Sequence, residues 1–302
     1  MDITMTETFH IISDGSCDLP TELVQEKNIT VVPFYVSFDD THYYKENVEI
    51  GIRDFYQQMV ERKGVYPKSS MPSIQDYEEA FLPFAEIEMP VICICITTKF
   101  SGSMQSALNA KALILEKYPQ AQITVIDATI NTVLQGQYVL EAAALRDYGV
   151  SYQDAIVRLE EIKSTGRIFF TVGNMEYLKH GGRIGKAAAA TGTVLQLKPM
   201  IEYRDCGLHS AGLVRGRKKS LQRCLELFRE YVEREHIDLS DYTVTTGYGY
   251  DHAEYAAFND RAAELLSDLG RPWERLGDFH ISVTIGVHTG PHPIGIGLLR
   301  RA

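Results

Sequence analysis

The first half of the chain repeats one unit, which is a short apolar run, a polar turn and a segment with helical spacing. The most apolar run is 90–98, which has no charged residue and is typical of a strand buried on both faces. It leads into the turn 101–103 and a helical pattern over 104–116. The runs 9–13 and 123–127 also precede helical patterns. The repetition predicts an α/β fold with a parallel sheet covered by helices.

Ligands collect where the strands of such a sheet end, so the turns 14–17 and 101–103 are expected to meet at one edge. Asp18 is the expected N-cap of a helix that has Pro20 near its first turn. The other elements expected in this half are a strand at 30–38, helices at 52–62 and 74–86, and a polar extended loop at 67–72.

The second half has a different order of elements. A helix is expected at 152–164. The expected strands, which need not be parallel, are 167–172, 199–203, 212–214, 242–248 and 280–287. This order predicts a mixed α+β second domain, with the domain boundary near 150–155.

Length and composition limit the class of protein. A chain of 302 residues suggests about two domains, and 45% apolar with 23% charged residues is typical of a globular protein. No window has the roughly 18 uninterrupted apolar residues of a membrane span. Residues 1–8 lack the order of a secretory signal and are expected to be a disordered lead-in.

The cysteines indicate a reducing compartment. Their number is odd (5) and they are scattered, which argues against a disulfide framework and predicts a cytoplasmic location. Cys93 and Cys95 alternate with isoleucines and are expected to be core residues of a strand. No further Cys or His pair follows at the spacing of a metal site, so we expect no metal.

The charge is distributed unevenly. The net charge of −10 argues against nucleic acid as a partner. However, the tract 163–223 holds 12 basic residues against 3 acidic residues. This polarity indicates a docking face for an acidic partner.

Three hydroxyl-rich turns are candidate sites for a carboxylate, because short hydroxyl donors and backbone N–H groups bind such a group well. A helix beginning just beyond the second turn would add its dipole. Each turn taken alone is more commonly structural. The candidate residues are Ser69 and Ser70, Ser101 and Ser103, and His288 with Thr289.

Enzymatic alternatives have weaker support. A Ser/His/Asp set can be drawn from Ser101, His288 and Asp14, but Ser101 is outside the Gly-x-Ser-x-Gly pattern of hydrolases. Neither of the glycine-rich phosphate or dinucleotide motifs is present. Asp14 and Asp18 could be an acid pair or Mg²⁺ ligands, although turn and cap roles are more common for such residues.

The segment 179–186 combines paired glycines with cations. Such a turn lets the backbone approach a phosphate or a partner, and the alternative is a tight turn with solvated charges. The small residues 187–190 and Gly192 would either pack closely or leave room for an apolar tail.

Seven segments, in this order, resemble the DegV family of bacterial fatty-acid-binding proteins. They are SDGSCDLP at 13–20, PKSSMPS at 67–73, SGS with QSA at 101–107, YLKHGGRIGK at 177–186, KP at 198–199, RGRKK at 215–219 and HTGP at 288–291. The resemblance covers about residues 9–299.

The resemblance implies an N-terminal Rossmann-like α/β domain at 9–152 and a C-terminal α+β domain with a mixed sheet at 153–302 (the EDD fold). The acyl chain of a long-chain fatty acid would lie between them, and the loop 63–75 would contact the second domain. Hydroxyls of Ser69 and Ser101 would hold the carboxylate, with the remaining candidates, Ser70 and His288, nearby.

The resemblance also implies a lipid carrier without catalytic residues or a cofactor. Some members are the carrier subunit of a fatty acid kinase and present the lipid to a separate ATP-binding subunit. Arg183 and Arg217 are then the candidates for contacting that subunit or the phosphate. Peripheral contact with a membrane is left open.

Four departures from the family pattern lie in these segments. Cys17 stands where the family has a small Ala. Ser69 stands where the family usually has Thr, and Met71 where Gln is common. The last turn reads Gly-Pro-His-Pro at 290–293 instead of Gly-Pro-Gly-Ala, which is expected to stiffen and crowd it.

Overall fold

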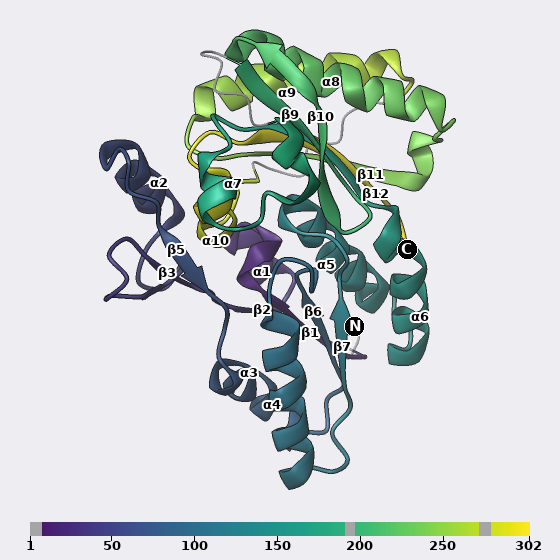
Figure 1. Cartoon of the computed structure of the whole chain (residues 1–302). Coiled ribbons are helices and arrows are strands. Elements are labelled where there is room, and N and C mark those ends of the chain that lie inside the picture. Colours follow the sequence, from purple (N-terminus) through teal and green to yellow (C-terminus); the bar gives the residue numbers. More distant parts are fainter. Residues whose placement is uncertain (1–7, 191–196, 272–278) are drawn as a thin grey trace.

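The computed structural model describes residues 8–190, 197–271 and 279–302, and Figure 1 shows the arrangement of its elements. Most of the predicted lead-in (1–7) and Gly192 lie outside the described residues. A parallel and an antiparallel sheet lie on either side of helix α5 (Thr132–Asp147). None of the described helices is long and apolar enough to cross a membrane.

The parallel sheet has the strand order β2-β1-β6-β7. Its strands are β1 (His10–Asp14), β2 (Ile29–Val32), β6 (Val91–Cys95) and β7 (Ile123–Asp127). The helices of this half include α1 (Thr21–Glu26), α3 (Ile74–Glu86) and α4 (Ser103–Lys117). Strands β1 and β6 are completely buried, because α3 and α4 cover one face of the sheet and α5 covers the other. The predicted α/β fold is confirmed.

The predicted single strand at 30–38 is wrong, because the chain leaves the parallel sheet at Pro33. Proline lacks the N–H that a further ladder bond would use. The chain then enters a small antiparallel sheet, which Figure 1 shows projecting from the side of the molecule, and one of its strands occupies the predicted loop 67–72. Its strands and covering helix are β3 (Tyr35–Ser37), β4 (Tyr44–Lys45), β5 (Lys68–Ser70) and α2 (Ile52–Glu61).

The second large sheet has the strand order β10-β9-β8-β12-β11, and all its pairings are antiparallel. Its strands are β8 (Arg167–Thr171), β9 (Leu197–Arg204), β10 (Gly207–Arg215), β11 (Tyr242–Tyr248) and β12 (Ile294–Arg300). The helices of this half are α6 (Tyr152–Ile162), α7 (Glu176–His180), α8 (Arg217–Arg234), α9 (His252–Asp268) and α10 (Val283–Thr289). Short 3₁₀ segments lie at Gly15–Cys17, Lys163–Thr165, Gly185–Ala190 and Leu239–Asp241.

The predicted strand at 280–287 is wrong, because most of it forms helix α10. The segment alternates apolar residues (281, 283, 285 and 287) with polar residues or glycine as a strand does, but Val283–Val287 are buried all round the helix. The chain then enters β12, a strand without a matching prediction, between β8 and β11. Its glycines at 295 and 297 lie so close to the backbone of β8 that a side chain would not fit.

The expected capping role of Asp18 is also wrong. Helix α1 begins after Pro20 and has no side-chain cap. Asp18 has a left-handed backbone (φ 53°), and its carboxylate is buried and bonded to α5 and to the start of α10. The residue therefore joins the two halves of the chain instead of capping its own helix.

Candidate functional site

A cavity of about 280 Å³ lies between the carboxyl end of the parallel sheet, the antiparallel sheet and α10. Its inner wall is mainly apolar. Phe34 and Ile96 come from the parallel-sheet side, Ile168 and Phe170 from β8, and Ile285 from α10. The polar lining groups come from several separate segments of the chain.

The four side chains predicted for a carboxylate site all line this cavity. Ser69 and Ser70 come from β5, Ser101 from the turn before α4, and His288 from α10. Ser69 Oγ lies 3.2 Å from Nε2 of His288, and the backbone N–H of Ser103 donates to Ser101 Oγ at 3.1 Å. The fold therefore gathers hydroxyls and an imidazole from three distant segments beside one apolar cavity.

The imidazole of His288 is neutral near pH 7. Burial, with a smaller contribution from the Arg183 cation, lowers the pKa of His288 to about 4. Its Nδ1 has no hydrogen-bond partner among the described residues, and it lies against Gly181, where a Cβ would overlap it. In the tautomer that carries its proton on Nε2, the ring can donate to Ser69 or to an acceptor in the cavity.

The two arginines predicted to contact a partner lie in different places. Arg183 lines the cavity, and its guanidinium donates to the carbonyl of Phe100 at 3.0 and 3.1 Å and to that of Gly181 at 2.6 Å. Arg217 is absent from the described lining and forms two hydrogen bonds to the Glu254 carboxylate, at 2.7 and 2.8 Å. Of these two arginines, only Arg183 is therefore in the described lining of the cavity.

Part of the basic tract at 163–223 is paired with nearby acids. The further pairs are Lys163 with Glu160, Arg204 with Glu202 and Asp205, and Arg223 with Glu226 and Glu230. Such local pairing weakens the positive field that the sequence indicated.

Asp14 joins the two turns at the edge of the parallel sheet. It is fully buried at the end of β1, and burial raises its pKa although the hydrogen bonds that it accepts oppose the shift. The donors are Ser16 Oγ (2.5 Å), Ser103 Oγ (2.7 Å), Gln135 Nε2 (2.8 Å) and the N–H of Ile96 (2.9 Å). The expected meeting of the turns 14–17 and 101–103 is confirmed.

Ser101, His288 and Asp14 do not form the relay of a serine hydrolase. A relay needs the imidazole to bond the nucleophile through one nitrogen and the acid through the other. Here Nε2 of His288 faces Ser69, and Nδ1 has no partner among the described residues. The bonds of Asp14 go to Ser16, Ser103, Gln135 and Ile96 instead.

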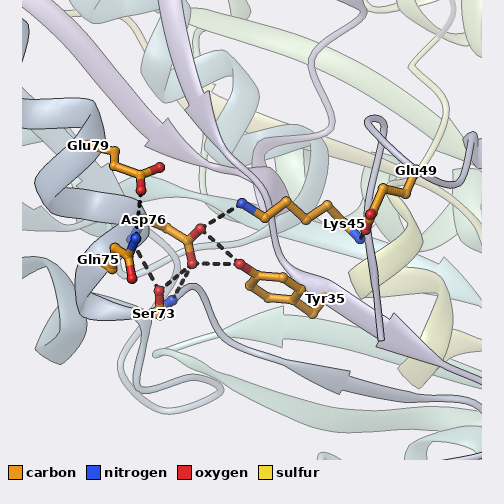
Figure 2. Close-up of polar contacts among 7 residues, drawn as sticks. All are labelled: Tyr35, Lys45, Glu49, Ser73, Gln75, Asp76 and Glu79. Carbon is orange, nitrogen blue, oxygen red and sulfur yellow. Dashed lines mark hydrogen bonds and ion pairs between the residues drawn. The ribbon is translucent and has the colours of Figure 1, made fainter. Parts of the chain in front are cut away.

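Asp76 fixes the segment 68–73, which carries the first hydroxyl pair (Figure 2). Its buried carboxylate accepts hydrogen bonds from Ser73 at the start of α3, from Tyr35 on β3 and from Lys45 on β4. The distances are 2.8 and 2.6 Å from the N–H and Oγ of Ser73, 2.8 and 2.9 Å from the Tyr35 hydroxyl, and 2.9 Å from Lys45 Nζ. One carboxylate thus holds the segment at its helical end and holds the sheet on which β5 lies.

Further contacts in Figure 2 surround this carboxylate. The N–H of Lys45 donates to Glu49 at 2.7 Å, and the amide of Gln75 donates to Glu79 at 2.9 Å. Burial would raise the pKa of Asp76, but the hydrogen bonds that it accepts and the Lys45 ammonium hold that pKa below its usual value. Asp76 is therefore an anion at neutral pH.

The model of the family described as "uncharacterised protein, DegV family" matches residues 8–301. The chain belongs to the DegV family. A DegV domain-containing protein of Clostridium perfringens is 31% identical over 285 residues, which cover 93% of this chain and 94% of that protein.

Solved structures of DegV proteins have the same fold. A fatty acid (stearic acid)-binding protein from Eubacterium ventriosum is 39% identical with a TM-score of 0.91, over 97% of this chain and 98% of that chain. A DegV family protein from Thermus thermophilus that binds a fatty acid is 30% identical with a TM-score of 0.84, over 97% and 99%. The predicted family and architecture are therefore confirmed.

Several polar lining residues of this DegV chain had no motif to mark them. Asn131 and Thr132 lie at the start of α5, and Thr284 lies on α10, which the sequence pattern assigned to a strand.

Cys93 and Cys95 are buried in β6. Among the described residues, no cluster of His, Cys, Asp or Glu could hold a metal ion.

We expect Asp76→Asn to lower the free energy of unfolding at pH 7 by about 1–3 kcal/mol, the range for a hydrogen bond to a charged group. Because the folded pKa of Asp76 lies below its unfolded value, its contribution is present above about pH 4 and is lost as the pH falls through the folded pKa. Urea unfolding at several pH values should show the two proteins converging in acid. Glu79→Gln, an exposed change on the same helix, is the control, and an equal loss in both variants would contradict the role of Asp76.

Gly181→Ala should displace the imidazole of His288, because the added Cβ would overlap Nδ1. Gly182→Ala is the matched control: its φ of +67° makes the change a backbone strain of about 1 kcal/mol, with open space around the Cβ. We expect the NMR signals of the His288 ring to shift in Gly181→Ala and to stay near their original positions in Gly182→Ala. Unchanged signals in the first variant would show that Gly181 does not set the ring position.

Proposed function

We propose that this protein binds a long-chain fatty acid, with the carboxylate at Ser69, Ser101 and His288 and the acyl chain in the apolar cavity. The observation that carries the proposal is the meeting of these three side chains beside that cavity. Ser70 is more exposed and would contact the headgroup from the rim. The fatty-acid-binding relatives of similar fold support it.

The energetics suit a carrier. Burying about 14 methylenes at ~0.8 kcal/mol each gives a gross gain near 11 kcal/mol, before the entropy costs of binding. Burying a bare carboxylate costs several kcal/mol unless hydrogen bonds replace its water. Two hydroxyls and the neutral imidazole of His288 can supply these donors, so the tail gives affinity and the polar groups give orientation.

The binding step itself needs no proton transfer. The hydroxyls of Ser69 and Ser101 rotate their protons toward the carboxylate, and Nε2–H of His288 completes the set. Ser69 exchanges its contact with His288 for one to the ligand. The imidazole of His288 is a weak base, because its pKa is about 4 and no described carboxylate bonds its Nδ1, and this favours binding over turnover.

We propose further that the protein acts in the cytoplasm and presents its lipid to the ATP-binding subunit of a fatty acid kinase. The domain division at 9–152 and 153–302 belongs to this proposal, with the ligand held between the domains. Arg183 lines the cavity beside the proposed headgroup site, and Arg217, which is outside the described lining, would contact the partner. Peripheral membrane contact would supply or remove the lipid.

Mass spectrometry of lipid extracted from the purified protein tests the binding proposal. Acyl chains recovered at about one per protein would support it. A protein that stays empty after incubation with fatty acids, and that turns over an ester substrate, would replace the carrier with the hydrolase alternative.

Ser101→Ala should weaken fatty-acid binding by about 5- to 150-fold, the equivalent of losing one donor to a buried charged group. Ser164→Ala, an exposed serine on a 3₁₀ turn, is the control and should bind as the original protein does. Titration with a fluorescent fatty acid measures both. An unchanged affinity in Ser101→Ala would remove this hydroxyl from the headgroup site.

Arg217→Ala should leave fatty-acid binding within about twofold, because the residue is outside the described lining, and should reduce phosphorylation of the bound lipid by a fatty acid kinase. Arg223→Ala removes another paired arginine of α8 and serves as the control. Full phosphorylation with Arg217→Ala would refute its role in docking.

A further inference from the structure

Two buried carboxylates hold the beginning of α10. The N–H of Ser282 donates to Asp18 Oδ1 at 2.9 Å, and the N–H of Thr284 donates to Glu46 Oε2 at 2.9 Å. Asp18 is 3% exposed and Glu46 is 1% exposed. The first N–H groups of any helix lack partners within the helix, and here acids from the other half of the chain supply them.

The second oxygen of each carboxylate bonds the parallel-sheet half. Glu46 Oε1 accepts the N–H of Phe34 at 3.1 Å, and Asp18 Oδ2 is bonded by the hydroxyl of Thr132. Phe34, Thr132 and Thr284 all line the cavity. Each acid therefore bridges two walls of the cavity.

Helix α10 depends on such outside contacts. It has seven residues, among them Val283, Thr284, Ile285 and Val287, whose β-branched side chains lower helix propensity. Its far end carries His288, whose ring contacts Ser69. A shift of its first turn would move that ring, because a helix this short behaves as one rigid piece.

The charges around the two acids do not neutralise them. The titratable groups that interact electrostatically with one or both acids are Asp14, the Cys17 thiol and the Tyr56 phenol, and none of them is a cation. No ion pair between described residues includes Asp18 or Glu46. Burial raises the pKa of each to about 7, so the pair is expected to hold a proton near neutral pH.

Hydrogen-bond geometry decides which acid takes that proton. Both oxygens of Glu46 accept from backbone N–H groups, which cannot become acceptors, so a proton on either oxygen would weaken the bond at that oxygen and would find no acceptor in that N–H group. Asp18 faces the hydroxyl of Thr132, which can rotate and accept a hydrogen bond from the protonated acid. The arrangement suits an anionic Glu46 and an Asp18 that gains and loses a proton.

We propose that Asp18 and Glu46 are positioning residues for the carboxylate site, with Glu46 as a fixed anion and Asp18 as the proton-carrying acid, and that together they set His288 against Ser69. The inference rests on the proposed fatty-acid function. It predicts opposite outcomes for two isosteric changes. Asp18→Asn reproduces the protonated acid, whereas Glu46→Gln turns an amide N–H₂ toward a backbone N–H.

The test measures affinity for a fluorescent fatty acid between pH 5.5 and 8.5 in the original protein, Asp18→Asn, Glu46→Gln and the exposed control Glu22→Gln. We expect Glu46→Gln to lose on the order of tenfold or more at every pH, the cost of an unpaired buried N–H. The original protein should bind more weakly as Asp18 ionises beside Glu46. The affinity of Asp18→Asn should equal that of the original protein at low pH and should not fall as the pH rises. Titration of the ligand's own carboxyl group affects all four proteins equally.

Equal losses in both variants, or an unchanged pH profile in Asp18→Asn, would overturn the proposal. Thermal unfolding gives a second readout. Because the folded pKa of Asp18 lies above its unfolded value, its stabilising contribution is full below about pH 4 and is lost as the pH rises through about 7. The original protein should therefore lose stability relative to Asp18→Asn over this range.

The same variants separate this inference from the proposed function. If the original protein binds no fatty acid, the function fails, and the NMR signals of the His288 ring without ligand then test the positioning. We expect these signals to shift in Glu46→Gln and to stay in place in Asp18→Asn. If Glu46→Gln does not fold, the pH profile and unfolding of Asp18→Asn decide the proposal alone.

Discussion

The cavity depends on buried carboxylates that accept hydrogen bonds from its walls. Asp14 bonds the N–H of Ile96 and the hydroxyl of Ser103, while Asp18 and Glu46 bond the start of α10. An unpaired carboxylate would be costly there, but each of these accepts several donors. The segments that carry these donors are not paired with a strand through them. The acids therefore supply the acceptors that a neighbouring strand supplies within the sheets.

This arrangement explains why the site has neutral donors at its centre. The negative charge of the buried acids already lies behind the wall that a ligand carboxylate would approach. The groups nearest to the proposed position of that carboxylate are hydroxyls and the imidazole of His288. The imidazole is uncharged near pH 7 because its pKa is about 4. The cation of Arg183 lies at the exposed side and is occupied by the carbonyls of Phe100 and Gly181. A ligand held in this way gains orientation from the polar groups without a buried ion pair, which suits reversible binding.

The sequence predicted those parts of the fold that local pattern determines. A run such as 90–98 is typical of a buried strand in a covered sheet, and β6 lies there. The pattern failed where partners distant in sequence decide the structure: 280–287 has the alternation of a strand but forms a helix held by Asp18 and Glu46. The family motifs named Ser69, Ser101 and His288, whereas Glu46 stands in no motif, and only the fold shows that it contacts α10.

The departures from the family pattern lie at the edge of this site. Met71 packs its thioether against Gly102, where a Cβ would meet the sulfur at 2.7 Å, so it closes the side between two of the hydroxyl turns. In the last turn, Pro293 lines the cavity, whereas His292 is turned toward Gly173 and away from it. Of these two residues, Pro293 alone is in the described lining, and its ring adds apolar surface to the wall. The hydroxyls, the imidazole and the acids behind them are all present, so under the proposed function these changes would alter the space for the acyl chain more than the contacts to its headgroup.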